Sequence, residues 1–153
     1  MAAAATSELY STYLTFLMAK TGSPAAYTQL GDIKNYPDIG SASDMIDMST
    51  LSNASKIGIP GIKNQDAMQF TFNYNPTVYQ TIKAYDDNKG HDFAVYFGAT
   101  VTTSAVTPTG DDGKFEFKGM LSGPVISGKG VNEGREMTVT ITPTTDIAFS
   151  AAT

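Results

Sequence analysis

The chain has 153 residues, which is enough for one domain with a hydrophobic core and too few for two comfortable ones. It contains no cysteine, which excludes disulfides, thiolate catalysis and cysteine-based zinc sites. Its formal net charge is −5 and its basic residues stand singly, so it lacks the basic stripe with which duplex-binding proteins displace counterions from phosphate.

Charged residues make up only 16% of the chain, whereas roughly 25% is usual for a soluble domain. Threonine, serine, glycine and asparagine take their place, which favours β structure with many turns. A surface with few charges also suits a protein that hides much of itself in contacts with neighbours.

The start of the sequence, Met1–Glu8, lacks the basic region and the continuous apolar core of a secretory signal. No apolar run approaches the ~20 residues that a membrane helix needs. We therefore expect synthesis in a cytoplasm and no membrane partner.

We expect residues 1–26 to form an arm and residues 27–153 to form a single β domain. The apolar and aromatic residues of the arm form two adjacent stripes, which fit either an amphipathic helix or a strand. These residues are Leu9, Tyr10, Tyr13, Leu14, Phe16 and Leu17.

After the arm, Tyr27–Ile33 and Asp44–Ser49 are predicted strands, separated by a turn cluster at Asn35–Gly40. Thr50–Ala67 is predicted to be a long irregular loop. Loops longer than about 12–15 residues are uncommon and usually functional or mobile.

Met68–Tyr74 alternates strictly between apolar and polar residues, which predicts a strand with one buried and one wet face. Asn75 and Pro76 predict the start of a helix, as an N-cap residue followed by proline at N1. We expect this helix to reach Asp86 and Gly90 to provide its stop. The apolar face that should cover the sheet consists of Val78, Ile82 and Tyr85.

Three later segments, Asp92–Val101, Lys114–Met120 and Glu136–Thr142, are predicted strands because apolar residues alternate with polar ones in each. Pro108–Gly113 is predicted to be a hairpin tip, since Asp-Gly readily takes the positive φ that such turns require. Together the segments predict a mainly β protein, an antiparallel sandwich or barrel of about seven strands with one flanking helix.

The sequence offers little for chemistry. His91 is the only histidine, and a surface residue at the start of a strand is the favoured interpretation over a general base. Asp86–Asp92 looks like a calcium loop but fails the EF-hand pattern at its fifth, sixth and twelfth positions. Gly128–Gly134 is glycine-rich, but it lacks phosphate-loop spacing and precedes a strand. We therefore predict no catalytic residue, no metal site and no cofactor.

The apolar stretch Ile57–Ile62 is unusual inside a predicted loop. Its isoleucines either fold back onto the domain's own core or form an exposed patch, which normally marks an interaction surface. The aromatic residues of the arm offer a second surface of the same kind.

A series of segments occurs in a fairly specific order along the chain. The segments are Phe16–Gly22, Leu30–Gly40, Thr50–Leu51, Ile59–Ile62, Phe70–Tyr74, Gly130–Glu133 and Met137–Pro143. In this order they resemble the major tail tube proteins of long, non-contractile-tailed bacteriophages, the kind found in phages of Gram-positive hosts. The resemblance runs from near Leu14 to the C-terminus.

The resemblance implies a β-sandwich or barrel with one flanking helix, hexameric rings that stack into a tube, and a β-lined lumen. It implies no catalytic residues. The family's main contact between subunits and rings is a long loop, which corresponds here to Thr50–Ala67. The candidate contact residues between subunits are Tyr10, Tyr13, Phe16, Leu17, Leu51, Lys56, Ile57, Ile59, Pro60, Ile62 and Lys63.

The expected partners are copies of the chain itself, the tape-measure protein that the tube encloses, the tail-tip and tail-terminator proteins, and viral DNA that passes without specific binding. The expected location is the virion tail, after synthesis in the cytoplasm of the bacterial host. A ring needs a heterologous interface that closes. The acidic balance suits a conduit, because carboxylates facing the lumen would repel phosphate.

Three alternatives stay open at this point. A ring-forming tube component of a secretion or effector-delivery system would share the geometry. A monomeric ligand-binding β-barrel would need an apolar pocket. An enzyme is the weakest alternative, because the sequence holds a single histidine and no cysteine.

Overall fold

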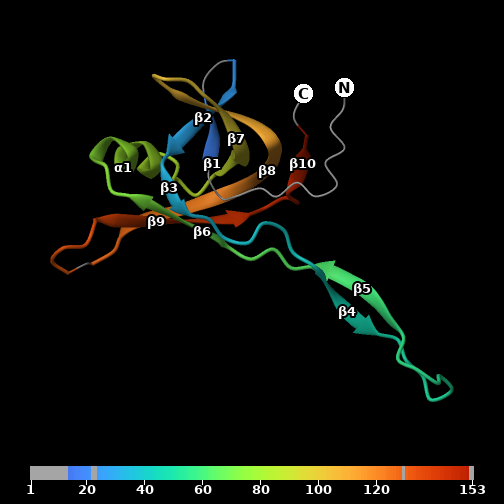
Figure 1. The fold of residues 1–153 in the computed structure, drawn as a ribbon. Helices are drawn as coiled ribbons and strands as arrows, with labels where there is room; N and C mark the ends of the chain where they lie inside the picture. Colours follow the sequence, from blue (N-terminus) through green and yellow to red (C-terminus); the bar gives the residue numbers. More distant parts are fainter. Residues whose placement is uncertain (1–13, 22–23, 129, 152–153) are drawn as a thin grey trace, which may run out of the picture.

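The computed structural model describes residues 14–21, 24–128 and 130–151. Within these residues the chain forms ten strands and a single helix. Figure 1 shows a β domain from which one long hairpin projects. The elements are β1 (Thr15–Thr21), β2 (Ala26–Gly31), β3 (Ile33–Asn35), β4 (Ser43–Asp47), β5 (Gly58–Lys63), β6 (Met68–Asn73), α1 (Pro76–Lys83), β7 (Gly90–Val101), β8 (Val106–Ile126), β9 (Glu136–Pro143) and β10 (Ala148–Ser150).

The domain is built on one antiparallel sheet with the order β2-β1-β7-β8-β9-β6-β3, to which β10 adds by pairing with β8. The long strand β8 joins the two halves of this sheet, because it pairs with β7 through Met120 and with β9 from Gly119 onward. β8 curves strongly (Figure 1), so the two halves face each other across a common core. The predicted mainly β, antiparallel architecture with one helix is confirmed.

The core between the two halves is aromatic. Phe70 and Phe72 of β6 and Phe93 of β7 are fully buried, and the rings of Phe93 and Phe117 lie 6.2 Å apart. Burial alternates along β6 in the order that its sequence predicts, with apolar residues inside and polar residues outside. Aromatic side chains bury large areas each, and they share this core with aliphatic residues such as Leu17, Val139 and Ile141.

Helix α1 covers the open side of the fold, where it packs against β2 and β8. Asn75 is its N-cap, and the side-chain oxygen of Asn75 accepts a hydrogen bond from the Thr77 N–H at 2.9 Å. Ile82 is fully buried. A Cβ at Gly31 of β2 would lie 2.8 Å from a methyl group of Val78, so only glycine allows the helix to sit this close to the strand.

Two expectations about element ends are wrong. The helix ends at Lys83 with Ala84 as its C-cap, and Gly90 begins β7 instead of stopping the helix. Thr50–Ala67 is not irregular throughout, because Gly58–Lys63 forms β5 and pairs with β4. Glycine and proline within β5 hid this strand, since both residues are depleted in strands.

The predicted arm, residues 1–26, overlaps the sheet. Thr15–Thr21 forms β1 between β2 and β7, and its residues Leu17 and Ala19 are fully buried. The sheet of the described chain therefore begins at Thr15 and not at residue 27. Residues 1–13 lie outside the described residues.

The predicted hairpin tip at Pro108–Gly113 is a bulge inside β8. Gly98 of β7 stands opposite this segment, where the β7–β8 register shifts between Phe97 and Ala99. The chain reverses further along, where the Thr102 N–H donates to the Ala105 carbonyl at 2.8 Å. Gly110 and Gly113 do adopt positive φ, but a bulge uses that conformation as readily as a turn does.

Replacing Phe72 by alanine should lower the free energy of unfolding by about 3–5 kcal/mol, because the fully buried ring leaves a cavity in the core. Phe149→Ala is the matched control: its ring is 63% exposed and its loss should cost less than about 1.5 kcal/mol. Urea unfolding followed by circular dichroism measures both values. Equal losses for the two variants would contradict the assignment of the core.

Candidate functional site

The most prominent feature outside the domain is the hairpin formed by β4 and β5, which projects well beyond the body of the molecule (Figure 1). Its strands pair with Met45 opposite Pro60 and Ile46 opposite Ile59. The ladder continues to the Met48 N–H, which donates to the Ile57 carbonyl at 2.8 Å. The hairpin is therefore an ordered two-stranded ribbon and not an unstructured loop.

Both faces of this ribbon are apolar. Directly paired residues of antiparallel strands point to the same face, so Ile46 and Ile59 share one face while Met45 and Pro60 share the other. The Met45 side chain lies over Gly58, where an added Cβ would approach its sulfur to 2.4 Å. A two-stranded ribbon has no interior, so these side chains remain in water in the single chain.

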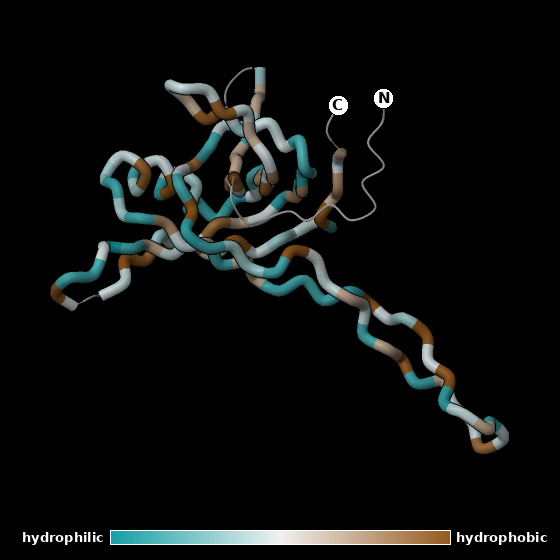
Figure 2. The backbone as a smooth tube through the Cα atoms, in the orientation of Figure 1, coloured by the Kyte–Doolittle hydropathy of each residue, from teal (hydrophilic) through white to brown (hydrophobic). Residues whose placement is uncertain are grey.

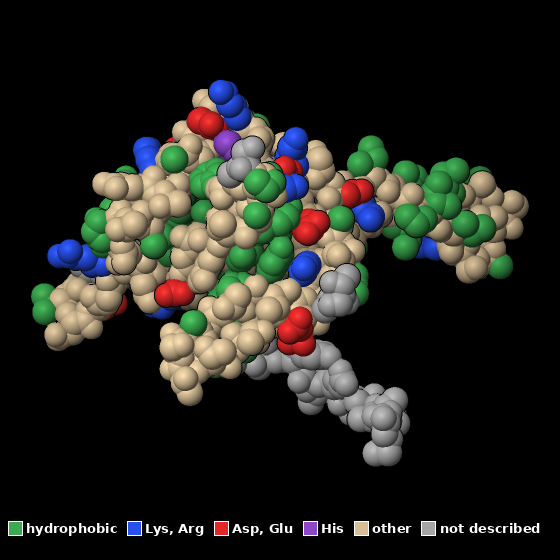
Figure 3. Space-filling model, turned by 90° about the horizontal axis from the view of Figure 1, so that it is seen from above, with side chains coloured by type: hydrophobic (Ala, Val, Ile, Leu, Met, Phe, Trp, Pro, Cys, Tyr) green, Lys and Arg blue, Asp and Glu red, His purple; other side chains and the backbone are tan. Residues whose placement is uncertain are grey.

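The hairpin is rich in hydrophobic residues, as its brown segments in Figure 2 show, and Figure 3 shows a cluster of green hydrophobic side chains on its surface. Its apolar residues and their exposed fractions are Met45 79%, Ile46 48%, Met48 52%, Leu51 109%, Ile57 49%, Ile59 45% and Ile62 88%. The apolar stretch Ile57–Ile62 thus forms an exposed patch and does not fold back onto the core.

The structure separates the predicted contact residues into two groups. Those on the hairpin are all exposed, namely Leu51, Lys56, Ile57, Ile59, Pro60, Ile62 and Lys63. Phe16 and Leu17 are both buried in the single chain. Leu17 belongs to the core between the two halves of the sheet, whereas Phe16 packs with Met18, Ala94 and Tyr96 on the outward side of β1 and β7, and the contact role of both stays a prediction. Tyr10 and Tyr13 lie outside the described residues.

Sequence reasoning missed half of the hairpin surface. Met45 and Ile46 lie in β4 and Met48 directly follows it, and the sequence predicts only a strand here, with no sign that it leaves the domain. The signal was present, because Met45 and Ile46 are adjacent apolar residues and a strand with one wet face alternates instead.

A hollow of ≈ 660 Å³ lies at the base of the hairpin. Its walls are mainly polar, and Asp38, Asp44, Asp66 and Asp146 contribute carboxylates to them. The Gln65 amide donates a hydrogen bond to Asp146 at 2.6 Å across this region. Such a wall does not suit an apolar ligand, and the space between the two halves of the sheet is filled by the core.

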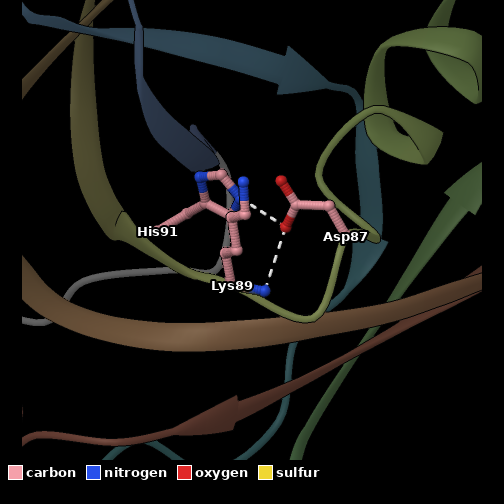
Figure 4. A network of polar contacts seen from close by, with 3 residues as sticks. All are labelled: Asp87, Lys89 and His91. Carbon is pink, nitrogen blue, oxygen red and sulfur yellow. Dashed lines mark hydrogen bonds and ion pairs between the residues drawn. The ribbon is translucent and has the colours of Figure 1, made fainter.

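His91 lies at the start of β7, where the sequence placed it, and fastens the turn that follows α1. Its Nε2 lies 2.9 Å from the Asp87 carboxylate, which also accepts a hydrogen bond from the Lys89 backbone N–H at 3.0 Å (Figure 4). The hydrogen bond from His91 is the main cause that lowers the pKa of Asp87. The ring stands edge-on to Tyr85 at 5.1 Å. These contacts account for His91 as a structural residue of the turn.

The outward side of β2, β1, β7 and the first part of β8 carries charges around a pair of tyrosines. We call it the charged face; it comprises Lys20, Tyr27, Asp92, Tyr96, Lys114, Glu116 and Lys118. The Tyr27 and Tyr96 rings lie 5.9 Å apart. Lys20 stands over the Tyr27 ring at 5.5 Å, and Lys114 stands over the Tyr96 ring at 5.1 Å.

Two further findings concern membranes and metals. In the part of the chain that the structure describes, no helix is long and apolar enough to cross a bilayer. Over the same residues, no three histidine, aspartate or glutamate side chains gather into a group that could hold a metal ion.

Comparison with known proteins identifies the family. Residues 18–152 match the family described as phage tail tube protein, TTP. Because this match spans most of the sequence, the chain belongs to the phage tail tube protein family, whose members are structural proteins of the virion tail. No curated protein matches the sequence.

Solved structures show the same fold at low sequence identity. The sheath/tube terminator of the extracellular contractile injection system PVC, in its extended state, has a TM-score of 0.67 at 9% identity over 96% of this chain and 100% of that one. The cap of the anti-feeding prophage has a TM-score of 0.66 at 13% identity, over 99% and 97%. The tail of an empty GTA particle, refined with C6 symmetry, has 0.66 at 9%, over 94% and 100%.

Tyr27 on the charged face should make the free energy of unfolding decrease at high pH. Burial first, then the carboxylates of Glu116 and Asp92, raise the pKa of Tyr27 from 10.0 to about 12 in the folded chain. The folded state holds this proton more tightly than the unfolded state does, so the contribution is complete below pH 10 and is lost as the pH rises towards 12. The unfolding free energy should fall over this window, and it should fall less steeply in Tyr27→Phe, which has no phenol to ionise. Urea unfolding at intervals up to pH 12 measures both slopes, and identical slopes would refute the assignment.

Proposed function

We propose that this protein is the repeating subunit of a phage tail tube, and that its copies form hexameric rings which stack through the β4–β5 hairpin. The observation that carries the proposal is the hairpin itself, an ordered ribbon with apolar side chains on both faces and no cover from its own domain. Exposed apolar patches of this kind normally mark contacts with other chains.

A ribbon with two apolar faces needs two partners. One face bears Ile46 and Ile59, and the opposite face bears Met45 and Pro60. A neighbour in the same ring can cover one face and a subunit of the next ring can cover the other. Such contacts are heterologous, so they close into a ring when the rotation fits and repeat indefinitely along the stack.

The remaining exposed hairpin residues fit the same role. Leu51 lies at the far end of the hairpin and is fully exposed, where it can enter a neighbouring ring. Lys56 and Lys63 supply charge at the margins of the apolar surface, as polar rims do in protein interfaces. The carboxylates around the hollow at the hairpin base are suitable partners for such lysines.

The structurally similar proteins support the proposal that this chain forms a tube. The GTA tail was refined with C6 symmetry, which is the symmetry proposed here. The neighbours from injection systems are a sheath/tube terminator and a tube-terminating cap, so this fold also serves at tube ends. The further partners proposed for this chain are a tape-measure protein inside the tube, and tail-tip and terminator proteins at its ends. We propose synthesis in the host cytoplasm before incorporation into the virion tail.

A second candidate is a tube component of an extracellular injection system. The likeness to the PVC and anti-feeding prophage structures favours it, whereas the family match favours a phage tail. The genes that flank the coding sequence distinguish the two: capsid and terminase genes indicate a phage, and sheath and effector genes indicate an injection system.

Changing Ile57, Ile59 and Ile62 together to serine should abolish rings and tubes, or raise the concentration needed for them by more than about tenfold, because burial of these side chains drives assembly. Negative-stain electron microscopy over a concentration series measures this. The unfolding free energy of the domain should stay close to that of the parent, since the three residues lie outside the core.

The matched control changes Val101 and Val106 to serine. Both are similarly exposed, at 54% and 46%, but they flank the β7–β8 turn, far from the hairpin (Figure 1). These changes should leave assembly intact. A parent chain that stays monomeric at every concentration contradicts the tube proposal, and equal loss of assembly in both variants contradicts the role of the hairpin.

A further inference from the structure

One outward surface of the sheet is covered by neutral polar side chains. It is formed by β3, β6, β9 and the last part of β8, and we call it the hydroxyl face. Its residues alternate with the buried residues of the same strands. The polar ones are Asn35, Gln69, Thr71, Asn73, Ser122, Thr138, Thr140 and Thr142. The register also places the uncharged, apolar Met120 and Val125 of β8 on this face, opposite Thr142 and Thr138.

The pairing register places these residues side by side. Thr140 lies opposite Gln69 of β6 and also opposite Ser122 of β8. Thr138 lies opposite Thr71, which is itself opposite Asn35 of β3. Hydroxyl and amide groups therefore form two rows that each cross three strands, and the row of Thr138 meets the apolar Val125 on β8.

Charges stand only at the margins of this surface within the described residues. At one end Glu136, opposite Asn73, forms an ion pair with Lys34 and is thereby neutralised. At the other end Lys118 lies where β8 bends towards the charged face. The charged face, by contrast, carries lysines and carboxylates around the cluster formed by Phe16, Met18, Ala94 and Tyr96.

The half-sheet that bears the hydroxyl face has two open edges in the described chain. β3 ends the sheet on one side. On the other side, residues 121–126 of β8 pair with β9 but extend past the last residue that β7 pairs, Met120. Val125 and Ile126 on this edge are 65% and 51% exposed. Open edges can pair with strands of a neighbouring copy, which would continue the same face from subunit to subunit.

We propose that the hydroxyl face lines the lumen of the tube and is the surface past which duplex DNA moves; this rests on the proposed function. Each lysine that meets a phosphate releases counterions and adds affinity. The charged face would therefore retain DNA in every ring. Neutral hydroxyls and amides exchange hydrogen bonds with water at little net change in free energy, so the hydroxyl face neither holds nor repels a polyanion.

This assignment differs from the expectation that carboxylates in the lumen repel phosphate. A neutral wall is indifferent to the sign of its cargo, and so it also suits a protein that fills the tube before DNA does. DNA passes here because the wall offers no cation, and not because the wall pushes it away.

The chain has no cysteine, so Gln69→Cys introduces a single thiol on the hydroxyl face. We would label this variant with a small maleimide and with a maleimide on a polymer too wide for the lumen, both as monomer and as assembled tube. Both reagents should label the monomer, because Gln69 is exposed. In the tube the small reagent should still react, while labelling by the bulky reagent should fall at least tenfold.

Other outcomes overturn the inference. Reaction of the bulky reagent with tubes would place the face outside, and protection from both reagents would place it in an interface between subunits. If Gln69→Cys forms no tubes, Thr142→Cys on the same face takes its place. Failure of the unsubstituted chain to form tubes would refute the proposed function itself, which separates the two failures.

A charge test uses two matched substitutions, Gln69→Lys on the hydroxyl face and Gln80→Lys on the exposed side of α1. Both add the same charge to every subunit. Tubes of Gln69→Lys should retain short duplex DNA about tenfold longer than parent tubes at low salt, and the difference should vanish at high salt. Tubes of Gln80→Lys should behave as the parent does. Equal retention by the two variants would overturn the proposal.

Discussion

The β4–β5 hairpin cannot bury its own apolar side chains, and this constraint organises the molecule. A sheet that packs on a second layer hides one face, but a two-stranded ribbon that projects into water hides neither. Ile46 and Ile59 on one side and Met45 and Pro60 on the other stay exposed in the single chain. Under the proposed function, assembly is the step in which this apolar surface leaves water, and the domain holds the ribbon for it.

The domain can do so because its own core is complete. β8 bends so that both halves of one sheet share an aromatic interior, and α1 covers the remaining side. The strands that lead into and out of the hairpin, β3 and β6, are paired with each other, with Ile33 opposite the fully buried Phe72. The chain on both sides of the hairpin is thereby paired next to the buried core.

The sequence predicted those strands and helix ends that depend on residues close together along the chain. The alternation in Met68–Tyr74 and the cap at Asn75 gave the right strand and the right helix start, because each depends on residues close in sequence. Pairings between distant segments were less accessible: nothing within residues 1–26 indicates that Thr15–Thr21 lies between β2 and β7. For the candidate surface, the composition of Ile57–Ile62 marked the segment as unusual but left open whether it folds back onto the core or is exposed. The exposure of Met45 depended on a partner strand that glycine and proline concealed.

The low charge of the chain, 16% of its residues, gains a physical meaning from this arrangement. A surface that will be covered by copies loses stability if it buries charges without partners, and the hairpin accordingly presents isoleucine and methionine. The surface proposed to face moving DNA is neutral for a different reason, because a fixed cation would bind phosphate and slow the DNA. This surface presents Thr138, Thr140 and Gln69. Charges lie at the margins of the hairpin, as in Lys56 and Lys63, and beside Tyr27 and Tyr96 on the opposite half of the sheet. One composition thus satisfies two separate requirements in different strands: β4 and β5 carry the apolar surface, and β3, β6, β9 and the last part of β8 carry the neutral polar one.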